Sequence, residues 1–177
     1  MKFEFDENNI TEAEFPILAQ SNQEPSEHFA KSKELRRNQG LIRIGFLGNN
    51  SMWEYETQFT QAQIKTLEFI KSNQFEILKS LFEYTKNKLY PEHIGYIGYD
   101  ETSFPPLDEI SNLRKALGVN FITLYIEEIL NSNYFALTCD FSGDFEHGVN
   151  IIMNRTKILG WEENLGNGLI LNDLNEK

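Results

Sequence analysis

The sequence predicts a single α+β domain in which about three helices pack on one face of an antiparallel sheet. Apolar residues recur at helical spacing in residues 60–118, and from residue 119 onward the pattern becomes typical of strands. A chain of 177 residues, 40% of them hydrophobic, is long enough for one sizeable core and short for two. We therefore expect residues 1–177 to form one domain.

The N-terminal part, residues 1–59, is expected to hold strands and an irregular segment. Polar and apolar side chains alternate over residues 2–6, which predicts a short strand. Residues 41–47 predict a second strand, and residues 52–59 alternate with a period of two. The short Gly-Asn-Asn link between these two segments predicts a hairpin. A preceding proline and a following glycine predict a helix over residues 26–37.

The helical segment begins with a start signal. Thr60 and Gln63 have the spacing of a capping box, in which each side chain satisfies a backbone donor at the helix start. Apolar residues at helical spacing then predict two consecutive helices, residues 61–71 and 74–89, separated by a Ser-Asn break. Asn73 is expected to cap the second helix with its side chain.

Pro91 is expected to end this helical run, because proline lacks the backbone donor that a helix interior uses. Residues 108–117 predict a third helix, closed by Gly118. Residues 119–164 are expected to form an antiparallel meander, and residues 165–177 a short tail that is polar at its end. The predicted strands of the meander are residues 119–129, 134–141, 149–154 and 157–161.

The chain is acidic, with 16 Lys and Arg against 27 Asp and Glu and a net charge of -11. Such a charge repels phosphate backbones and anionic lipid, so neither nucleic acid nor a membrane is an expected partner. The N-terminus lacks the apolar run of a signal peptide, and no stretch approaches the roughly 18 apolar residues of a membrane span. One cysteine, Cys139, allows no intramolecular disulfide, which fits a reducing cytoplasm.

More than half of the net charge lies after residue 118, where the sequence has nine acids and three bases. A localised negative face steers basic partners, and the alternative is a solvated sheet face without a partner. If the protein has a functional face, we expect it on the sheet and hairpin from Glu127 to Glu163. The acids expected to contact a basic protein are Glu127, Glu128, Asp140, Asp144, Glu146, Glu162 and Glu163.

Four side chains that could bind a cation lie within eight residues: Asp140, Asp144, Glu146 and His147. Carboxylate and imidazole groups bind divalent cations, so this segment is a candidate metal site. Its spacing matches neither a zinc motif nor an EF-hand loop. The alternative is a polar hairpin loop whose side chains bond backbone groups. No cofactor motif is present, and no cofactor is expected.

The sequence predicts no catalytic residue. His28 and His93 have no neighbouring serine, cysteine or acid at a spacing that indicates a triad. The glycines of residues 95–99 lack the Lys-Ser/Thr that follows a phosphate-binding loop. Cys139 lies in a predicted strand, where a thiol is usually buried and inert.

Short motifs in the C-terminal half carry a family resemblance. Residues 117–121, 134–141 and 146–151, with a strand end at Leu159-Gly160, resemble a bacterial family of uncharacterised domains. Members of that family have a Glu-His-Gly segment near the C-terminus. The upstream helices are similar to the central region of the family, so the resemblance covers about two-thirds of the chain.

The sequence departs from the family pattern at Phe141, where Trp is usual, at an inserted Ser142-Gly143, and at Asn150, where Gly is common. Domains of this family resemble small cytoplasmic proteins linked to toxin–immunity systems, which implies an immunity or interaction role. We expect a non-enzymatic protein-binding domain, of the immunity type that inhibits a basic toxin or effector. The alternatives are a metal-dependent enzyme or cation-binding protein that uses residues 140–147, and a structural domain without a ligand.

Overall fold

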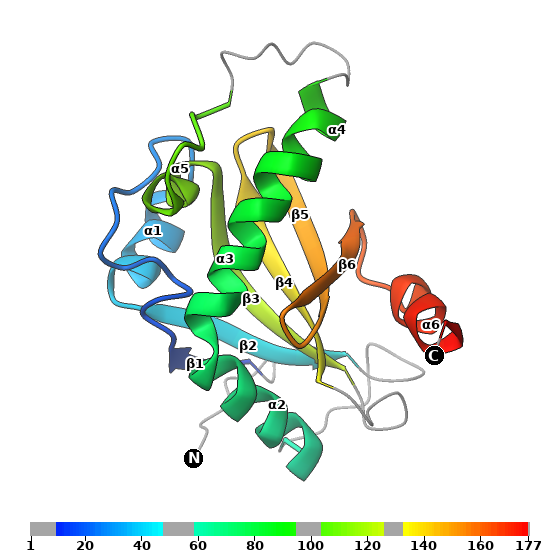
Figure 1. The fold of residues 1–177 in the computed structure, drawn as a ribbon. Coiled ribbons are helices and arrows are strands. Elements are labelled where there is room, and N and C mark those ends of the chain that lie inside the picture. The colour runs from blue at the N-terminus through cyan, green and yellow to red at the C-terminus, as the bar shows by residue number, and fades with distance from the viewer. Residues whose placement is uncertain (1–9, 48–58, 95–103, 126–132, 177) are drawn as a thin grey trace.

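The computed structural model describes residues 10–47, 59–94, 104–125 and 133–176 (Figure 1). The strand expected over residues 2–6, and all but the last residue of the hairpin strand expected over residues 52–59, lie outside this part of the chain. None of the helices described is long and apolar enough to cross a membrane.

One sheet of six strands forms the centre of the structure, and the strands follow one another across it in chain order. All neighbouring strands are antiparallel except β2 and β3. These two are parallel, an arrangement that requires a long connection such as the helix-containing one between them. The predicted α+β class is confirmed, with one parallel pair in the sheet. The strands are β1 (Thr11–Glu14), β2 (Leu41–Leu47), β3 (Leu117–Tyr125), β4 (Tyr134–Phe141), β5 (Asp144–Asn154) and β6 (Lys157–Glu162).

Several predicted strands are confirmed closely. β2 and β4 have the predicted bounds, and β6 is one residue longer than predicted. β3 begins two residues before its predicted start, because Leu117 pairs with Phe141 at the end of β4. The residues predicted to extend this strand beyond Tyr125 lie outside the described part of the chain.

The segment predicted as a polar hairpin loop is strand instead. β4 and β5 are joined by Ser142-Gly143, so β5 begins at Asp144 rather than at residue 149. The two strands pair at Phe141–Asp144 and again at Cys139–Val149, and the extra residues of β5 between these two pairs form a bulge. Within it Gly148 has φ +69°, and a Cβ there would lie 2.3 Å from the carbonyl oxygen of Cys139, so a side chain does not fit.

The two predicted central helices are confirmed as α2 (Gln61–Ser72) and α3 (Gln74–Tyr84). The capping box is also confirmed: Thr60 N donates to Gln63 Oε1 over 2.9 Å, and Gln63 N donates to Thr60 Oγ1 over 3.2 Å. The predicted side-chain cap at Asn73 is wrong. Its amide instead donates to the carbonyl of Phe69, one turn back, and so helps to end α2.

The helical run does not end at Pro91, contrary to the prediction. α3 continues through a π-helical turn, Thr85–Leu89, into α4 (Tyr90–Ile94), which contains the proline. In a π-helical turn each donor bonds five residues back, as Tyr90 N does to Thr85 O. Because the hydrogen-bond pattern shifts here, Pro91 lies in the first turn of a new helix, α4, where its missing N–H costs little.

The shorter helices differ from the prediction. α1 (Lys31–Asn38) begins five residues after the predicted start. The helix predicted over residues 108–117 is reduced to a 3₁₀ turn, Ile110–Asn112, and α5 (Leu113–Ala116), because the chain enters β3 at once. α6 (Gly168–Asn175) lies in the segment predicted as a tail.

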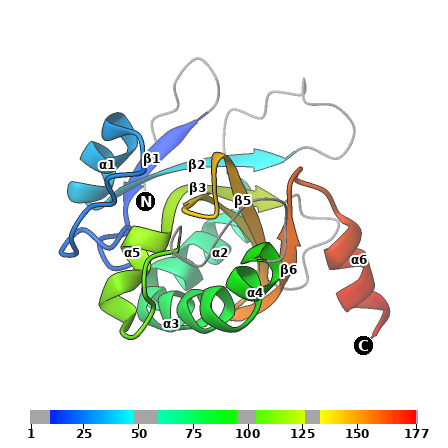
Figure 2. The ribbon, with the colours of Figure 1, turned by 90° about the horizontal axis from the view of Figure 1, so that it is seen from above.

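Helices cover both faces of the sheet (Figures 1 and 2). α2, α3, α4 and α5 lie on one face, as predicted, above the larger hydrophobic core. α6 lies beside β6 and closes a second, smaller core, so the prediction of helices on one face alone is incomplete. The buried members of the smaller core are Tyr125, Tyr134, Ala136, Ile152 and Ile170.

Candidate functional site

The structure does not gather the four residues of the predicted metal site. His147 N and Nδ1 lie 3.0 and 3.2 Å from Asp144 Oδ1, which makes a local pair at the start of β5. Glu146 is exposed, whereas Asp140 is buried and contacts α1. Across the described residues, no three His, Cys, Asp or Glu side chains come together in a way that could hold a metal ion. Metal binding here stays a prediction that this geometry does not support.

Asp140 joins β4 to α1. Its Oδ1 accepts from Lys33 Nζ over 2.6 Å, and its Oδ2 accepts from Arg37 Nη1 over 3.1 Å. Only 1% of the Arg37 side chain is exposed. The same guanidinium donates to the Gly118 carbonyl and to the side chain of Asn120, both on β3. Asp140 therefore anchors a helix to the sheet instead of facing a partner.

Glu34 extends this network to a second arginine. Its carboxylate accepts from Arg37, and its Oε2 accepts from Arg114 Nη2 over 2.5 Å. Arg114 is fully buried, and it also donates to two backbone carbonyls of the segment before α1, over 2.8 and 3.0 Å. We refer to Lys33, Glu34, Arg37, Arg114 and Asp140 as the arginine cluster.

The arginine cluster joins α1, α5 and β4, and each of its charges has an opposite partner. Burying a charge is tolerated only with such pairing. The arginine cluster is also tightly packed, because a Cβ added to Gly118 would lie 2.5 Å from Arg37 Nη1. We interpret the cluster as a cross-link between elements and not as a reaction centre.

A group of rings lies where α4 meets β4 and β6. The His93 ring packs between Phe141 and Trp161, with centroids 4.9 Å from each. His93 Nδ1 lies 2.8 Å from the carbonyl oxygen of Leu89 and donates to it, since a carbonyl can only accept. Trp161 Nε1 donates to Glu92 Oε2 over 2.8 Å, which fixes an acid beside the indole ring.

Four acids lie on α4, on β5 and at or just after the end of β6. We call Glu92, Glu146, Glu162 and Glu163 the acidic end. None of the four forms an ion pair among the residues described, although Glu162 Oε2 accepts from Gly166 N over 3.1 Å. Of the acids expected to bind a partner, Glu127 and Glu128 lie outside the described residues.

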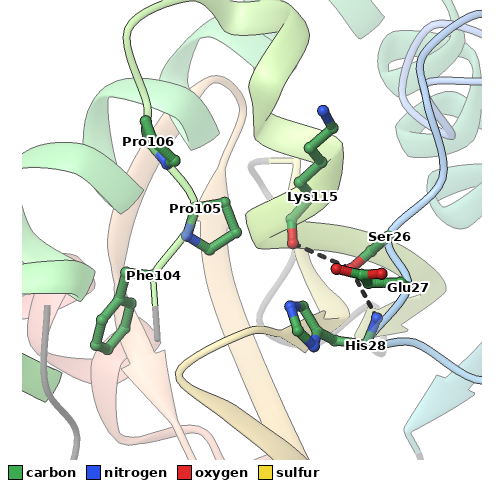
Figure 3. Close-up of a pocket in the computed structure, with 7 residues that line it drawn as sticks. All are labelled: Ser26, Glu27, His28, Phe104, Pro105, Pro106 and Lys115. Carbon is green, nitrogen blue, oxygen red and sulfur yellow. Dashed lines mark hydrogen bonds between the residues drawn. The ribbon is translucent and has the colours of Figure 1, made fainter. Parts of the chain in front are cut away.

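A small open pocket of about 260 Å³ lies between the segment before α1 and the residues that lead to α5 (Figure 3). His28 and Glu27 line one wall, and Pro105 and Pro106 line the other. Ser26 ties the first wall to α5 by donating to the Lys115 carbonyl over 3.2 Å (Figure 3). No side-chain hydrogen bond or ion pair joins the three titratable residues of the lining, Glu27, His28 and Lys115, and we interpret the pocket as a seam between two segments.

Cys139 is buried, as predicted, with 1% of its surface exposed. Burial, and secondarily the Asp140 carboxylate, raise the pKa of its thiol far above the ordinary value, while Arg37 opposes this. A thiol of this kind stays protonated and is a poor nucleophile. The Cys139 side chain therefore packs in the core as a small apolar group.

No protein-family model, curated protein or solved structure matches this chain. The resemblance to immunity-associated domains therefore stays a prediction that rests on the short motifs alone.

Sequence reasoning missed the arginine cluster and the group of rings. The only local signal for the first is the spacing of Glu34 and Arg37, which are three residues apart in one helix. Arg114 and Asp140 join that pair from distant parts of the chain, and no sequence pattern indicates this.

Proposed function

We propose that the protein is a non-enzymatic, cytoplasmic protein-binding domain of the immunity type, which binds a basic toxin or effector through its acidic end. The observation that carries the proposal is the set of four carboxylates, Glu92, Glu146, Glu162 and Glu163, that have no cationic partner among the described residues. Unpaired acids raise the negative potential of a surface and accelerate its encounter with a basic protein.

The centre of this surface has the composition of a binding site. Trp161 is half-buried on β6, and its ring is held on one side by His93. Partly exposed tryptophans that are surrounded by polar groups are frequent energetic centres of protein interfaces. The rigid ring loses little conformational freedom on binding, and the acids around it select a basic partner.

The partner can be sought among the products of neighbouring genes. We expect a basic toxin from such a gene to be captured by the protein, and cells that express the toxin to survive when the protein is coexpressed. The variant that carries Glu146→Lys and Glu163→Lys should bind at least tenfold more weakly, mostly through a slower association rate that depends on salt.

A matched control changes the same charge elsewhere. Glu68→Lys and Glu83→Lys alter exposed acids on α2 and α3, so this double variant should bind like the natural protein. If both double variants lose affinity equally, only net charge matters, and the acidic end is not the binding surface. If no neighbouring product is captured and no cell is protected, the immunity role is wrong.

A further inference from the structure

β6 is an edge strand whose outer side has no strand partner among the described residues. It is the last strand of the sheet and pairs only with β5. Beyond that ladder it makes no backbone–backbone hydrogen bond within the described part of the chain. None of its six residues is fully buried, in contrast to the mostly buried β4. A row of unpaired backbone donors and acceptors is a template for another strand.

The charges along the β5–β6 hairpin have opposite signs at its two ends. Arg155 and Lys157 lie at the turn that joins the strands, and both are exposed. Glu162 is the last residue of β6, and Glu163 follows it. Lys157 is 64% exposed even though Nζ contacts Asp173 Oδ1 over 2.7 Å, so the ammonium has donors to spare.

We propose that two copies of this chain pair through β6, antiparallel, about a two-fold axis between Leu159 and Gly160. In this arrangement Lys157 lies opposite Glu162 of the second copy, and Ile158 lies opposite Trp161. The two-fold axis repeats both pairs. Opposite charges and aliphatic–aromatic pairs are cross-strand combinations that stabilise antiparallel sheets. The charge pattern of β6 is therefore complementary to itself.

The faces of the strand agree with this register. Lys157 and Glu162 pair with Asn154 and Asn150 of β5, so both point to the face that α6 covers. Ile158 and Trp161 both pack against the larger core on the opposite face. The register of the β5–β6 pairing shifts between Ile158 and Gly160, which is where the two-fold axis would pass.

Net charge opposes any pairing of two chains that each carry -11. The Debye length is about 8 Å at physiological salt, so contacts across the new ladder count for more than distant charges. Arg155 of each copy comes beside Glu163 of the other, which adds two further pairs of opposite charge. Self-pairing does not require the proposed basic partner, and such a partner would compete with it at Glu162 and Glu163.

Charge exchange between separate variants tests the register. Arg155→Glu and Glu163→Lys alter exposed side chains that make no ion pair among the described residues, so both variants should fold. Sedimentation of the natural protein should show a monomer–dimer equilibrium. Each variant alone should dimerise roughly tenfold more weakly, because attraction becomes repulsion at two places. An equimolar mixture of the two variants should recover the dimer, since the glutamate introduced in one then faces the lysine introduced in the other.

Lys79→Glu and Glu68→Lys, on exposed helix surfaces, provide a control pair with the same charge changes. Each control variant should dimerise like the natural protein. A natural protein that stays monomeric at millimolar concentration would overturn the proposal. If Arg155→Glu and Glu163→Lys each leave the dimer unchanged, β6 is not the interface. The same conclusion follows if the mixture of the two variants does not recover the dimer.

Discussion

Two neighbouring arginines on α1 have opposite environments. Arg37 has 1% of its side chain exposed and contacts Glu34 and Asp140, whereas Arg36 has 33% exposed and lies 3.8 Å from Glu12. Residue type alone does not separate them, because both are basic residues in the last turn of the helix. The contrast arises from the direction in which each side chain leaves the helix.

We expect Arg37→Met to lower the free energy of unfolding by about 3 kcal/mol, because it removes one cationic partner from each of two buried carboxylates, Glu34 and Asp140. Arg36→Met should cost less than about 1 kcal/mol, since exposed ion pairs contribute little. Urea unfolding of the two variants gives both values. Equal losses would mean that the arginine cluster contributes no more than a surface pair.

At the scale of elements, α6 is held by one buried carboxylate as well as by apolar contacts. Asp173 accepts from Tyr134 Oη over 2.7 Å, from Asn154 Nδ2 over 2.9 Å and from Lys157 Nζ over 2.7 Å. These donors lie on β4, β5 and β6, so a single side chain on α6 joins the helix to three strands. An eight-residue helix is unstable alone, and such contacts explain why this one forms.

Asp173→Ala should therefore destabilise the protein by about 2–3 kcal/mol and loosen α6 more than the rest of the sheet. Hydrogen exchange should accelerate over residues 168–175 before it changes in β2 and β3. Asn172→Ala, an exposed neighbour on the same helix, should leave both the stability and the exchange unchanged. If exchange in α6 stays slow in Asp173→Ala, its apolar contacts alone hold the helix.

At the scale of the whole molecule, tyrosines make folding sensitive to alkali. Burial first, and the charge of Glu92 second, raise the pKa of Tyr84 to about 12. Burial also raises the pKa of Tyr90 to about 12, although the neighbouring Ser142 side chain opposes it. Burial raises the pKa of Tyr125 further, in the same direction. The folded state thus keeps protons that the unfolded state releases.

Because these pKa values are higher in the folded state, their contribution to stability is complete below about pH 10 and is lost as the pH rises toward about 12. We expect the free energy of unfolding to fall steeply across that window. Urea unfolding at a series of alkaline pH values, together with the ultraviolet titration of tyrosine, measures it. Tyr84→Phe should make the fall shallower, and an unchanged slope would contradict the assignment.

The sequence by itself determined the elements that have a strong local signal. The Thr60–Gln63 capping box, the two central helices and strands β2, β4 and β6 follow from side-chain periodicity and local hydrogen bonds. These signals act within a few residues, so the chain needs no distant partner to express them.

Only the tertiary structure decided what depends on contacts between distant residues. The π-helical turn that lets the helix pass Pro91, the strand in place of a loop after Gly143, and α6 each form against neighbours elsewhere in the chain. The same holds for Asp140. The sequence pattern predicted that it lies on a partner-binding surface, but in the folded chain it is buried against Lys33 and Arg37. A buried carboxylate requires cationic partners, and its environment is therefore set by which distant side chains the fold brings to it.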